Sequence, residues 1–225
     1  MNILNRDDLE RGGFAGLKET RLVMDPRLFN GRAEPDTWAG IGDFVYLADA
    51  SFQPRGETGL HSHKEIDVIS VMVEGRIGHE GSLEHGRELT GHNIQVQRAG
   101  GEGFAHNEVN PDSAENRMIQ LWVLPERPGE PAGYKLYETD WGQTARVYGG
   151  ATGQSDTYAS ETKIDVSLMR RDQTMTASGE CLAYLTKGSG TANGAPIREG
   201  SLIRSDGFVF EAAEDVQLIL VHLGS

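Results

Sequence analysis

Cysteine, proline, positive charge and long apolar runs are all scarce in this chain. Its 225 residues include one cysteine, Cys181, so an internal disulfide is excluded, which is typical of a reducing compartment. No apolar run approaches the roughly 20 residues of a membrane-spanning helix. Residues 1–8 lack the apolar segment of a signal peptide. These absences predict a cytoplasmic protein with no membrane partner.

Basic residues are outnumbered by acidic ones, 21 against 34, which gives a formal net charge of −13. A nucleic-acid-binding protein needs a basic surface, and an anionic membrane would repel this chain. The charge therefore argues against both partners and favours a freely soluble protein, which we expect to be a monomer.

Glycine is abundant, with 29 residues spread along the chain beside only 8 prolines. Many short strands closed by turns use glycine in this way. The segments with strand patterns are residues 44–50, 61–73, 118–124, 163–169, 181–186, 201–204 and 216–223. No segment of the second half keeps a helical period of 3.6 over ten residues, so the sequence predicts an all-β protein.

Two pairs of metal-ligand side chains stand out, each with its members two residues apart. They are His61 with His63, and His106 with Glu108. In a strand, residues i and i+2 point to the same face, so each pair would present both side chains together. Three imidazoles and one carboxylate suit Fe(II), Mn, Ni, Cu or Zn. The four residues therefore predict one mononuclear metal site.

Asp67 is a competing carboxylate. The odd positions of residues 61–73 begin with ligand-type residues, include Asp67 and end apolar, as the inside of a barrel with a site at its mouth would. We expect Glu108 to be the ligand and Asp67 to orient a histidine, but Asp67 in place of Glu108 stays open.

The two halves of the chain can be aligned on each other. His61, His63 and Asp67 then match Thr174, Thr176 and Glu180, and His106 and Glu108 match Phe210 and Ala212. The spacing is kept and the ligands are lost, with Phe210 expected to fill the place of His106. A proline-rich stretch at residues 125–131 marks a boundary. We expect a metal-binding barrel at 1–140, including an N-terminal arm, and a metal-free barrel at 141–225.

The remaining candidates have simpler interpretations. His79, His85 and His92 lie in or beside predicted turns, and we expect them to be solvated. His222 is expected to be structural, and Cys181 to be a buried, inert thiol. The tryptophans Trp38, Trp122 and Trp141 are expected to pack in the core or between the barrels.

These motifs resemble the cupin superfamily. Its first motif is matched by Gly56, His61, His63, Asp67 and Gly75, and its second by Gly91, Gly103, His106 and Asn110. More narrowly, residues 40–137 resemble pirin-like bicupins, which have two tandem cupin barrels (double-stranded β-helices, or jelly rolls). The chain departs from that pattern at Lys64 and Glu65, where Arg-Gly is usual, and at Asp67, where Glu is usual.

The resemblance implies a metal, usually iron, held by His61, His63, His106 and Glu108, with Glu108 also a general base. It implies a quercetin 2,3-dioxygenase type of reaction on a flavonoid-like aromatic with O₂, so the chain is a candidate oxidoreductase. Two alternatives stay open: a metal- or redox-responsive regulator that binds a protein partner, and another cupin reaction such as an isomerisation. The metal and the physiological substrate are not determined by the sequence.

Overall fold

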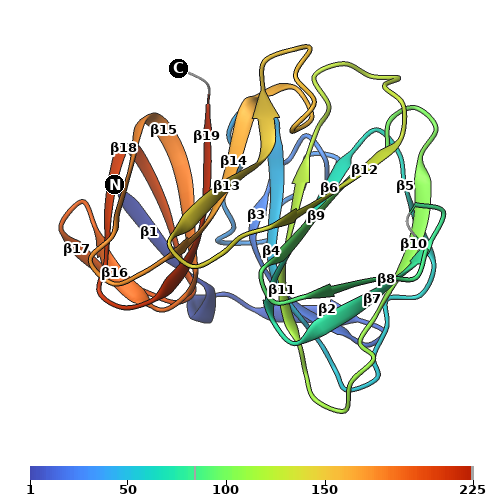
Figure 1. The fold of residues 1–225 in the computed structure, drawn as a ribbon, viewed down its shortest axis with the longest axis horizontal. Coiled ribbons are helices and arrows are strands. Elements are labelled where there is room, and N and C mark those ends of the chain that lie inside the picture. The colour runs from blue at the N-terminus through green and yellow to red at the C-terminus, as the bar shows by residue number, and fades with distance from the viewer. Residues whose placement is uncertain (84, 224–225) are drawn as a thin grey trace. The chain divides into compact units, whose positions relative to one another are not determined.

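The computed structural model describes residues 1–83 and 85–223, and strands dominate it (Figure 1). Within this part of the chain the one helical turn is the 3-10 helix η1 (Arg6–Asp8), and no helix is long and apolar enough to cross a membrane. The contacts divide the chain into two compact units, Leu9–Tyr137 and Met1–Asp8 with Glu138–Ser225. The all-β prediction is confirmed.

The unit Leu9–Tyr137 contains two antiparallel sheets. The larger has the order β12 (Gly133–Glu138), β9 (Asn93–Arg98), β6 (Asp67–Glu74), β11 (Arg117–Val123), β4 (Phe44–Phe52), β3 (Leu17–Met24) and β2 (Arg11–Phe14). The smaller has the order β5 (His61–His63), β10 (Phe104–Val109), β7 (Arg76–Gly81) and β8 (Arg87–Thr90). Ile77 and Leu89 of the smaller sheet pack with Phe52 and Met72 of the larger one, so the core lies between the two sheets.

The predicted continuous strand over residues 61–73 is wrong. The chain forms β5, leaves the strand at residues 64–66, and resumes in β6. Glu65 has φ +51°, a left-handed conformation that breaks the alternation of faces. As a result Ser70, an even position, contacts Glu108, and the expected inward row of odd positions does not continue past Glu65.

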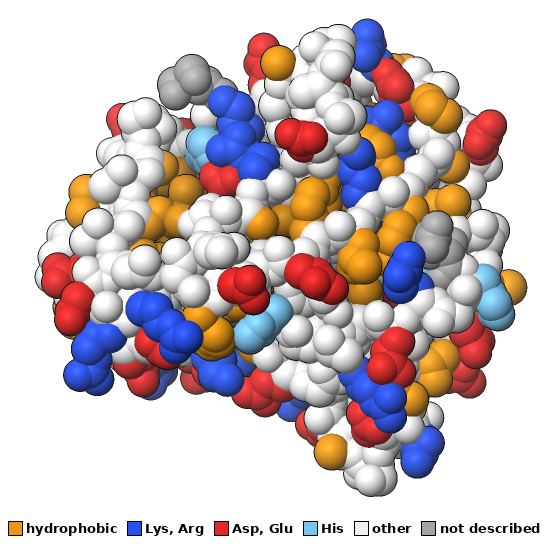
Figure 2. Space-filling view, in the orientation of Figure 1, with side chains coloured by type: hydrophobic (Ala, Val, Ile, Leu, Met, Phe, Trp, Pro, Cys, Tyr) orange, Lys and Arg blue, Asp and Glu red, His pale blue; other side chains and the backbone are white. Residues whose placement is uncertain are grey.

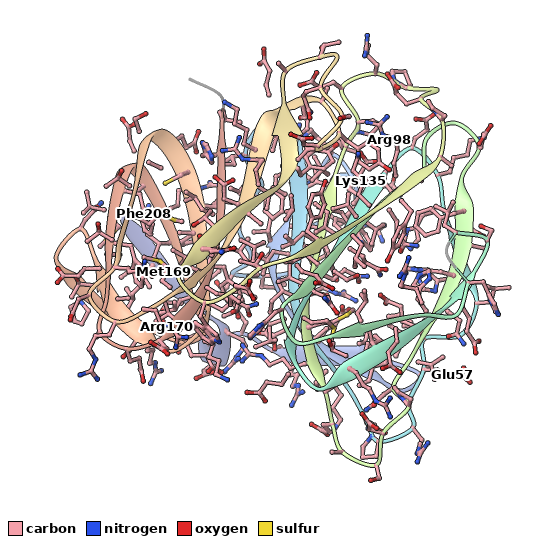
Figure 3. All side chains as sticks on the ribbon, viewed as in Figure 1. Glu57, Arg98, Lys135, Met169, Arg170 and Phe208 are labelled. Atoms are coloured by element: carbon pink, nitrogen blue, oxygen red, sulfur yellow. The ribbon has the colours of Figure 1, made fainter. Side chains whose placement is uncertain are left out.

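The second unit is built on one sheet. Its order is β13 (Gln143–Gly150), β14 (Ser160–Met169), β19 (Val216–Leu223), β15 (Thr174–Lys187), β18 (Ser201–Ala212), β16 (Ser189–Ala192) and β17 (Ala195–Arg198), and β1 (Asn2–Asn5) also pairs with β18. Its buried core includes Cys181, Phe210 and the residues Met169 and Phe208, which Figure 3 labels. Phe210 is fully buried, as predicted.

The alignment of the two halves made from the sequence is wrong by one residue in β15. In the first unit His106 pairs with His61 and Phe104 with His63, whereas in the second Phe210 pairs with Met175 and Phe208 with Ala177. Met175 and Ala177 pack on the core, whereas Thr174 is exposed. The counterparts of the ligand histidines His61 and His63 are therefore Met175 and Ala177. A bulge between Ala177 and Glu180 adds one residue to β15 and accounts for the difference of one position.

The N-terminal arm was expected in a domain spanning residues 1–140. Instead β1 pairs with β18, and Met1–Asp8 group with the second unit. The other end of the division falls between Tyr137 and Glu138, a few residues from the expected boundary and just after the proline-rich stretch. The arm could not be assigned from the sequence, because strand pairing over some 200 residues leaves no local signal.

The surface carries mixed charge. On the face drawn in Figure 2, acidic and basic side chains lie interspersed, without a continuous basic field. Several exposed pairs are ion pairs, such as Arg170 with Asp215 at 2.6 Å.

Candidate metal centre

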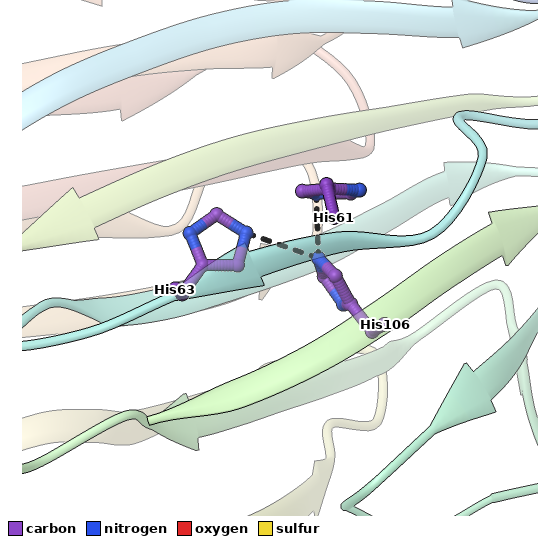
Figure 4. A group of neighbouring side chains, drawn as sticks. All are labelled: His61, His63 and His106. Atoms are coloured by element: carbon purple, nitrogen blue, oxygen red, sulfur yellow. Dashed lines mark hydrogen bonds between the residues drawn. The ribbon is translucent and has the colours of Figure 1, made fainter. Parts of the chain in front are cut away.

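Three histidines converge on one point between β5 and β10 (Figure 4). The Nε2 atom of His106 lies 2.9 Å from Nε2 of His61 and 3.1 Å from Nε2 of His63. One nitrogen from each of the three lies within 4.8 Å of the others. The i, i+2 spacing of His61 and His63 and their pairing with β10 bring the rings together, as the sequence predicted.

The donor set fits a divalent transition metal. Nitrogens that share one ion at bond lengths of about 2.0–2.1 Å lie about 3 Å apart when their bonds are near right angles, which matches the two measured spacings. Burial, together with a smaller effect of the neighbouring histidines, lowers the pKa of His63 to about 4 and that of His106 to about 2. Both imidazoles are therefore neutral at neutral pH and keep lone pairs for a metal.

Glu108 lies beside this group but is not part of it. Its side chain is almost fully buried, its backbone N–H donates to Thr58, and Ser70 donates to its Oε1 at 3.4 Å. Burial raises the pKa of Glu108 to about 7, against the hydrogen bond from Ser70. The carboxylate lines the same cavity as His61 and His63, so a role as fourth ligand or as base is a proposal.

Asp67 lies elsewhere. It is buried, and its carboxylate faces the guanidinium of Arg98, at 3.9 Å, on the paired strand β9. Arg98 also donates to Glu130. Asp67 is absent from the group of converging ligands, and this follows from the break at Glu65, which turns β6 relative to β5.

A cavity of about 200 Å³ adjoins the histidines. Its apolar wall includes Phe14, Phe29, Tyr46 and Trp122, and its polar wall includes Glu19, Arg21, Thr58, Gln120 and Glu108. Tyr46 and Trp122 are stacked with ring centroids 4.2 Å apart, and the ring of Trp122 meets that of His63 edge-on at 5.8 Å. Flat aromatic surfaces thus lie directly beside the candidate ligands.

A second, more open hollow of about 510 Å³ shares Met24 and Phe29 with the inner cavity. Its other walls come from residues 28–34. Arg21 of β3 links this segment to the strand, because it donates to Glu34 at 2.5 Å. It also donates to Glu19, on the same strand, at 2.6 Å. Phe29 therefore stands in the wall between the two spaces.

Two residues of this site were not predicted from the sequence. His79 was expected to be solvated, but it is 1% exposed, and its Nε2 lies 2.6 Å from Nδ1 of His106. Alternation along β7 could have found it, because His79 has the same parity as the buried Ile77. Trp122 packs against the core, as expected, but it also lines the cavity. Its half-buried position between buried neighbours in β11 is visible only in the fold.

The other candidates play no part in the cluster. His85 is exposed, whereas His222 is hydrogen-bonded to Asp165 at 3.1 Å, a structural role as predicted. Cys181 is fully buried, and burial raises the pKa of its thiol to about 11. It is therefore the inert thiol that the sequence indicated.

Comparison with known proteins relates part of the chain to a known family. Residues 26–123, less than half of the chain, match the family model described as Pirin. This segment resembles pirin. A pirin-like protein of Caulobacter vibrioides is 27% identical over 195 residues, which are 77% of this chain and 80% of that relative. A quercetin 2,3-dioxygenase of Escherichia coli K12 is 30% identical over 101 residues, 44% of this chain and 41% of the relative, so the match spans less than half of that protein.

The similarity in fold extends beyond the matched segment. The crystal structure of the bacterial pirin YhhW from Escherichia coli, in complex with nickel(II), superposes with a TM-score of 0.83. It is 18% identical and covers 99% of this chain and 98% of that one. The chain therefore has the fold of two tandem cupin barrels, as predicted, with a three-histidine cluster that could hold a metal.

Proposed function

We propose that this protein is a metal-dependent dioxygenase of flavonoid-like aromatic substrates. The observation that carries the proposal is the meeting of three converging histidines and a buried carboxylate with an aromatic-walled cavity. The quercetin 2,3-dioxygenase name of the Escherichia coli relative supports the choice of reaction.

Each part of the site has a proposed task. His61, His63 and His106 hold the metal, which we propose to be Fe(II), with Mn, Ni, Cu or Zn fitting the same ligand types. When bound, the ion supplies positive charge and open positions for a substrate oxyanion and for O₂. Glu108, in the cavity wall, completes the ligand set or accepts the proton of the substrate hydroxyl. Tyr46 and Trp122 offer flat surfaces on which an aromatic ring can pack.

The size of the cavity bears on the substrate. The inner space of about 200 Å³ is smaller than the 300–1,000 Å³ typical of pockets for drug-sized ligands. The adjoining hollow of about 510 Å³ beyond Phe29 brings the total into that range. We propose that one ring of a flavonol enters beside the histidines and that the remainder passes Phe29.

The test is oxygen consumption on quercetin. The protein is loaded separately with Fe(II), Mn(II), Ni(II), Cu(II) or Zn(II), its metal content is measured, and O₂ uptake is followed together with loss of quercetin absorbance. We expect equal consumption of the two with at least one metal, and none with His106→Ala, which should lose the metal. His85→Ala, at an exposed histidine outside the cluster, is the matched control and should match the wild type in metal content and O₂ uptake.

Two outcomes would contradict the proposal, one for the reaction and one for the metal centre. A fully metal-loaded protein that consumes no O₂ with quercetin would overturn the proposal. The pirin-like regulator would then be favoured if His61→Ala abolished binding to a protein partner. Equal metal in the wild type and in His106→Ala would overturn the metal centre itself.

A further inference from the structure

His79 lies against the side of His106 that faces away from the other two histidines. Its Nε2 lies 2.6 Å from Nδ1 of His106, and the ring centroids are 4.8 Å apart. The opposite nitrogen of His106, Nε2, is the one near His61 and His63. A metal shared by the three histidines would therefore be separated from His79 by the ring of His106, so His79 is not a fourth ligand.

The hydrogen bond between the two rings can be assigned in two ways. If His79 donates, Nδ1 of His106 accepts, and the proton of neutral His106 must then sit on Nε2, which leaves no lone pair for a metal. If His106 donates from Nδ1, its Nε2 is free to bind. His61 follows the second pattern, because its Nδ1 lies 2.9 Å from the carbonyl oxygen of Gly59 and can only donate there. In the second assignment, Nε2 of His79 accepts from His106 as the carbonyl oxygen of Gly59 accepts from His61.

The second unit provides an internal comparison. Strand pairing places His79 opposite Glu108, and places Gly190 opposite Ala212, the counterpart of Glu108. A Cβ atom on Gly190 would come within 2.7 Å of the ring of Phe210, the counterpart of His106. The copy that has lost its ligand histidines has thus also lost the side chain behind them, and a larger ring takes the space.

We infer that His79 is a positioning residue that accepts a hydrogen bond from Nδ1 of His106 and so presents the Nε2 lone pair of His106 to the metal. This inference rests on the metal centre of the proposed function and not on the substrate or the reaction. Metal-ligand histidines commonly have such a partner, and its loss typically costs 10–100-fold in metal affinity.

Proton placement can be measured directly in the wild-type protein. Two-bond ¹H–¹⁵N correlation spectra of the Zn²⁺-loaded wild-type protein, assigned by comparison with His79→Gln and His106→Ala, identify which nitrogens of His106 and His79 carry a proton. We expect the proton on Nδ1 of His106 and on Nδ1 of His79. A proton on Nε2 of His79, which could then not accept from His106, would overturn the inference.

Metal affinity gives a second readout. Calorimetric titration with Ni²⁺ should show binding weakened about 10–100-fold in His79→Phe, which keeps the ring shape but has no acceptor. His79→Gln, which retains an acceptor oxygen, should lose less, and His85→Phe, the same exchange at an exposed histidine, should lose nothing. Unchanged Ni²⁺ affinity in folded His79→Phe, or equal losses in His79→Phe and His79→Gln, would overturn the inference.

The outcome is separable from that of the proposed function. Wild-type protein that binds Ni²⁺ and carries the expected protons, but consumes no O₂ with quercetin under any metal, would refute the dioxygenase and leave the role of His79 standing. Normal turnover together with unchanged affinity in His79→Phe would refute the role of His79 alone.

Discussion

At the residue scale, Glu108 is a carboxyl group that folding removes from water. It is 1% exposed, and burial raises its pKa to about 7. A buried carboxylate is stabilised when a cation is nearby, and the three-histidine cluster would supply one. Burial of the Glu108 carboxylate lowers the stability of the fold, and a metal bound by the neighbouring histidines would explain why a carboxylate lies there.

Replacing Glu108 by glutamine tests this explanation. Glu108→Gln keeps the shape and removes the charge and the base, so turnover of the metal-loaded enzyme should fall by about 10²–10⁴-fold, the usual contribution of a general base. The measurement is kcat at equal metal content, determined by elemental analysis. Turnover within twofold of the wild type would contradict the assignment.

Asp67→Asn is the matched control, because it is the same exchange at the other candidate carboxylate. Asp67 faces Arg98 in the structure, so metal content and turnover should be unchanged. The free energy of unfolding should instead fall by roughly 1–3 kcal/mol, as expected when a buried charged partner is removed. Loss of metal in Asp67→Asn would revive Asp67 as a ligand.

At the element scale, the one-residue displacement in β15 decides which positions could hold a metal in the second unit. Met175 and Ala177 occupy the positions equivalent to His61 and His63. They pair with Phe210 and Phe208, as the two histidines pair with His106 and Phe104. In a His106→Ala background, the triple variant Met175→His, Ala177→His and Phe210→His should therefore bind Ni²⁺. The triple variant Thr174→His, Thr176→His and Phe210→His should not. Calorimetry on both triple variants tests this, and binding by the second set would contradict the pairing.

A second element-scale prediction concerns Asp165, which links three strands. Arg146 of β13 and His222 of β19 both hydrogen-bond to its carboxylate. Burial would raise the pKa of Asp165, but the bonds from His222 and Arg146 outweigh it and lower the pKa below its usual value. The stability it contributes is present above the unfolded pKa of about 3.9 and is lost as the pH falls through the folded pKa.

Urea unfolding between pH 7 and pH 2 measures this contribution. Asp165→Asn should be less stable than the wild type at pH 7, by about 1–3 kcal/mol, and the difference should shrink as the pH falls below about 4. A difference that stayed constant down to pH 2 would show that the charge of Asp165 is not involved.

The elements also show what the sequence could predict. Period-2 patterns and turn glycines predicted the all-β fold and the strands from Phe44 and from Val216. Ligand spacing predicted the convergence of His61, His63 and His106, because i, i+2 geometry is local. The conformation of Glu65, the displacement of β15 and the contact of His79 with His106 depend on tertiary pairing, so residue order alone did not predict them.

At the scale of the whole molecule, the chain has two copies of a barrel, and the residues that the structure describes contain one candidate metal centre. The ligands all belong to Leu9–Tyr137, and the corresponding core of the second unit is filled by Met175 and Phe210. A ligand that binds only the folded state stabilises it by about 2.7 kcal/mol at a free concentration of 100 Kd. That stabilisation should belong to the first unit.

Hydrogen exchange with and without Ni²⁺ at about 100 Kd tests this. Amides of β5 and β10 that exchange through opening of the first unit should slow by up to about 100-fold, which corresponds to that stabilisation. Amides of β15 and β18 should be unaffected. Equal slowing in both pairs of strands would contradict the prediction and indicate that the two units open together.

The placement of His63 and His106 has a further consequence for a chain with one cysteine. These residues are 43 positions apart, and His61 and His63 lie on a three-residue strand that pairs only with β10. A metal bound there would cross-link the chain, as a disulfide does in an extracellular protein. By the chain-entropy account, closing a loop of this length is worth about 3–5 kcal/mol. A single cysteine cannot form an internal disulfide, whereas this cross-link needs none, and a chelator would remove it reversibly.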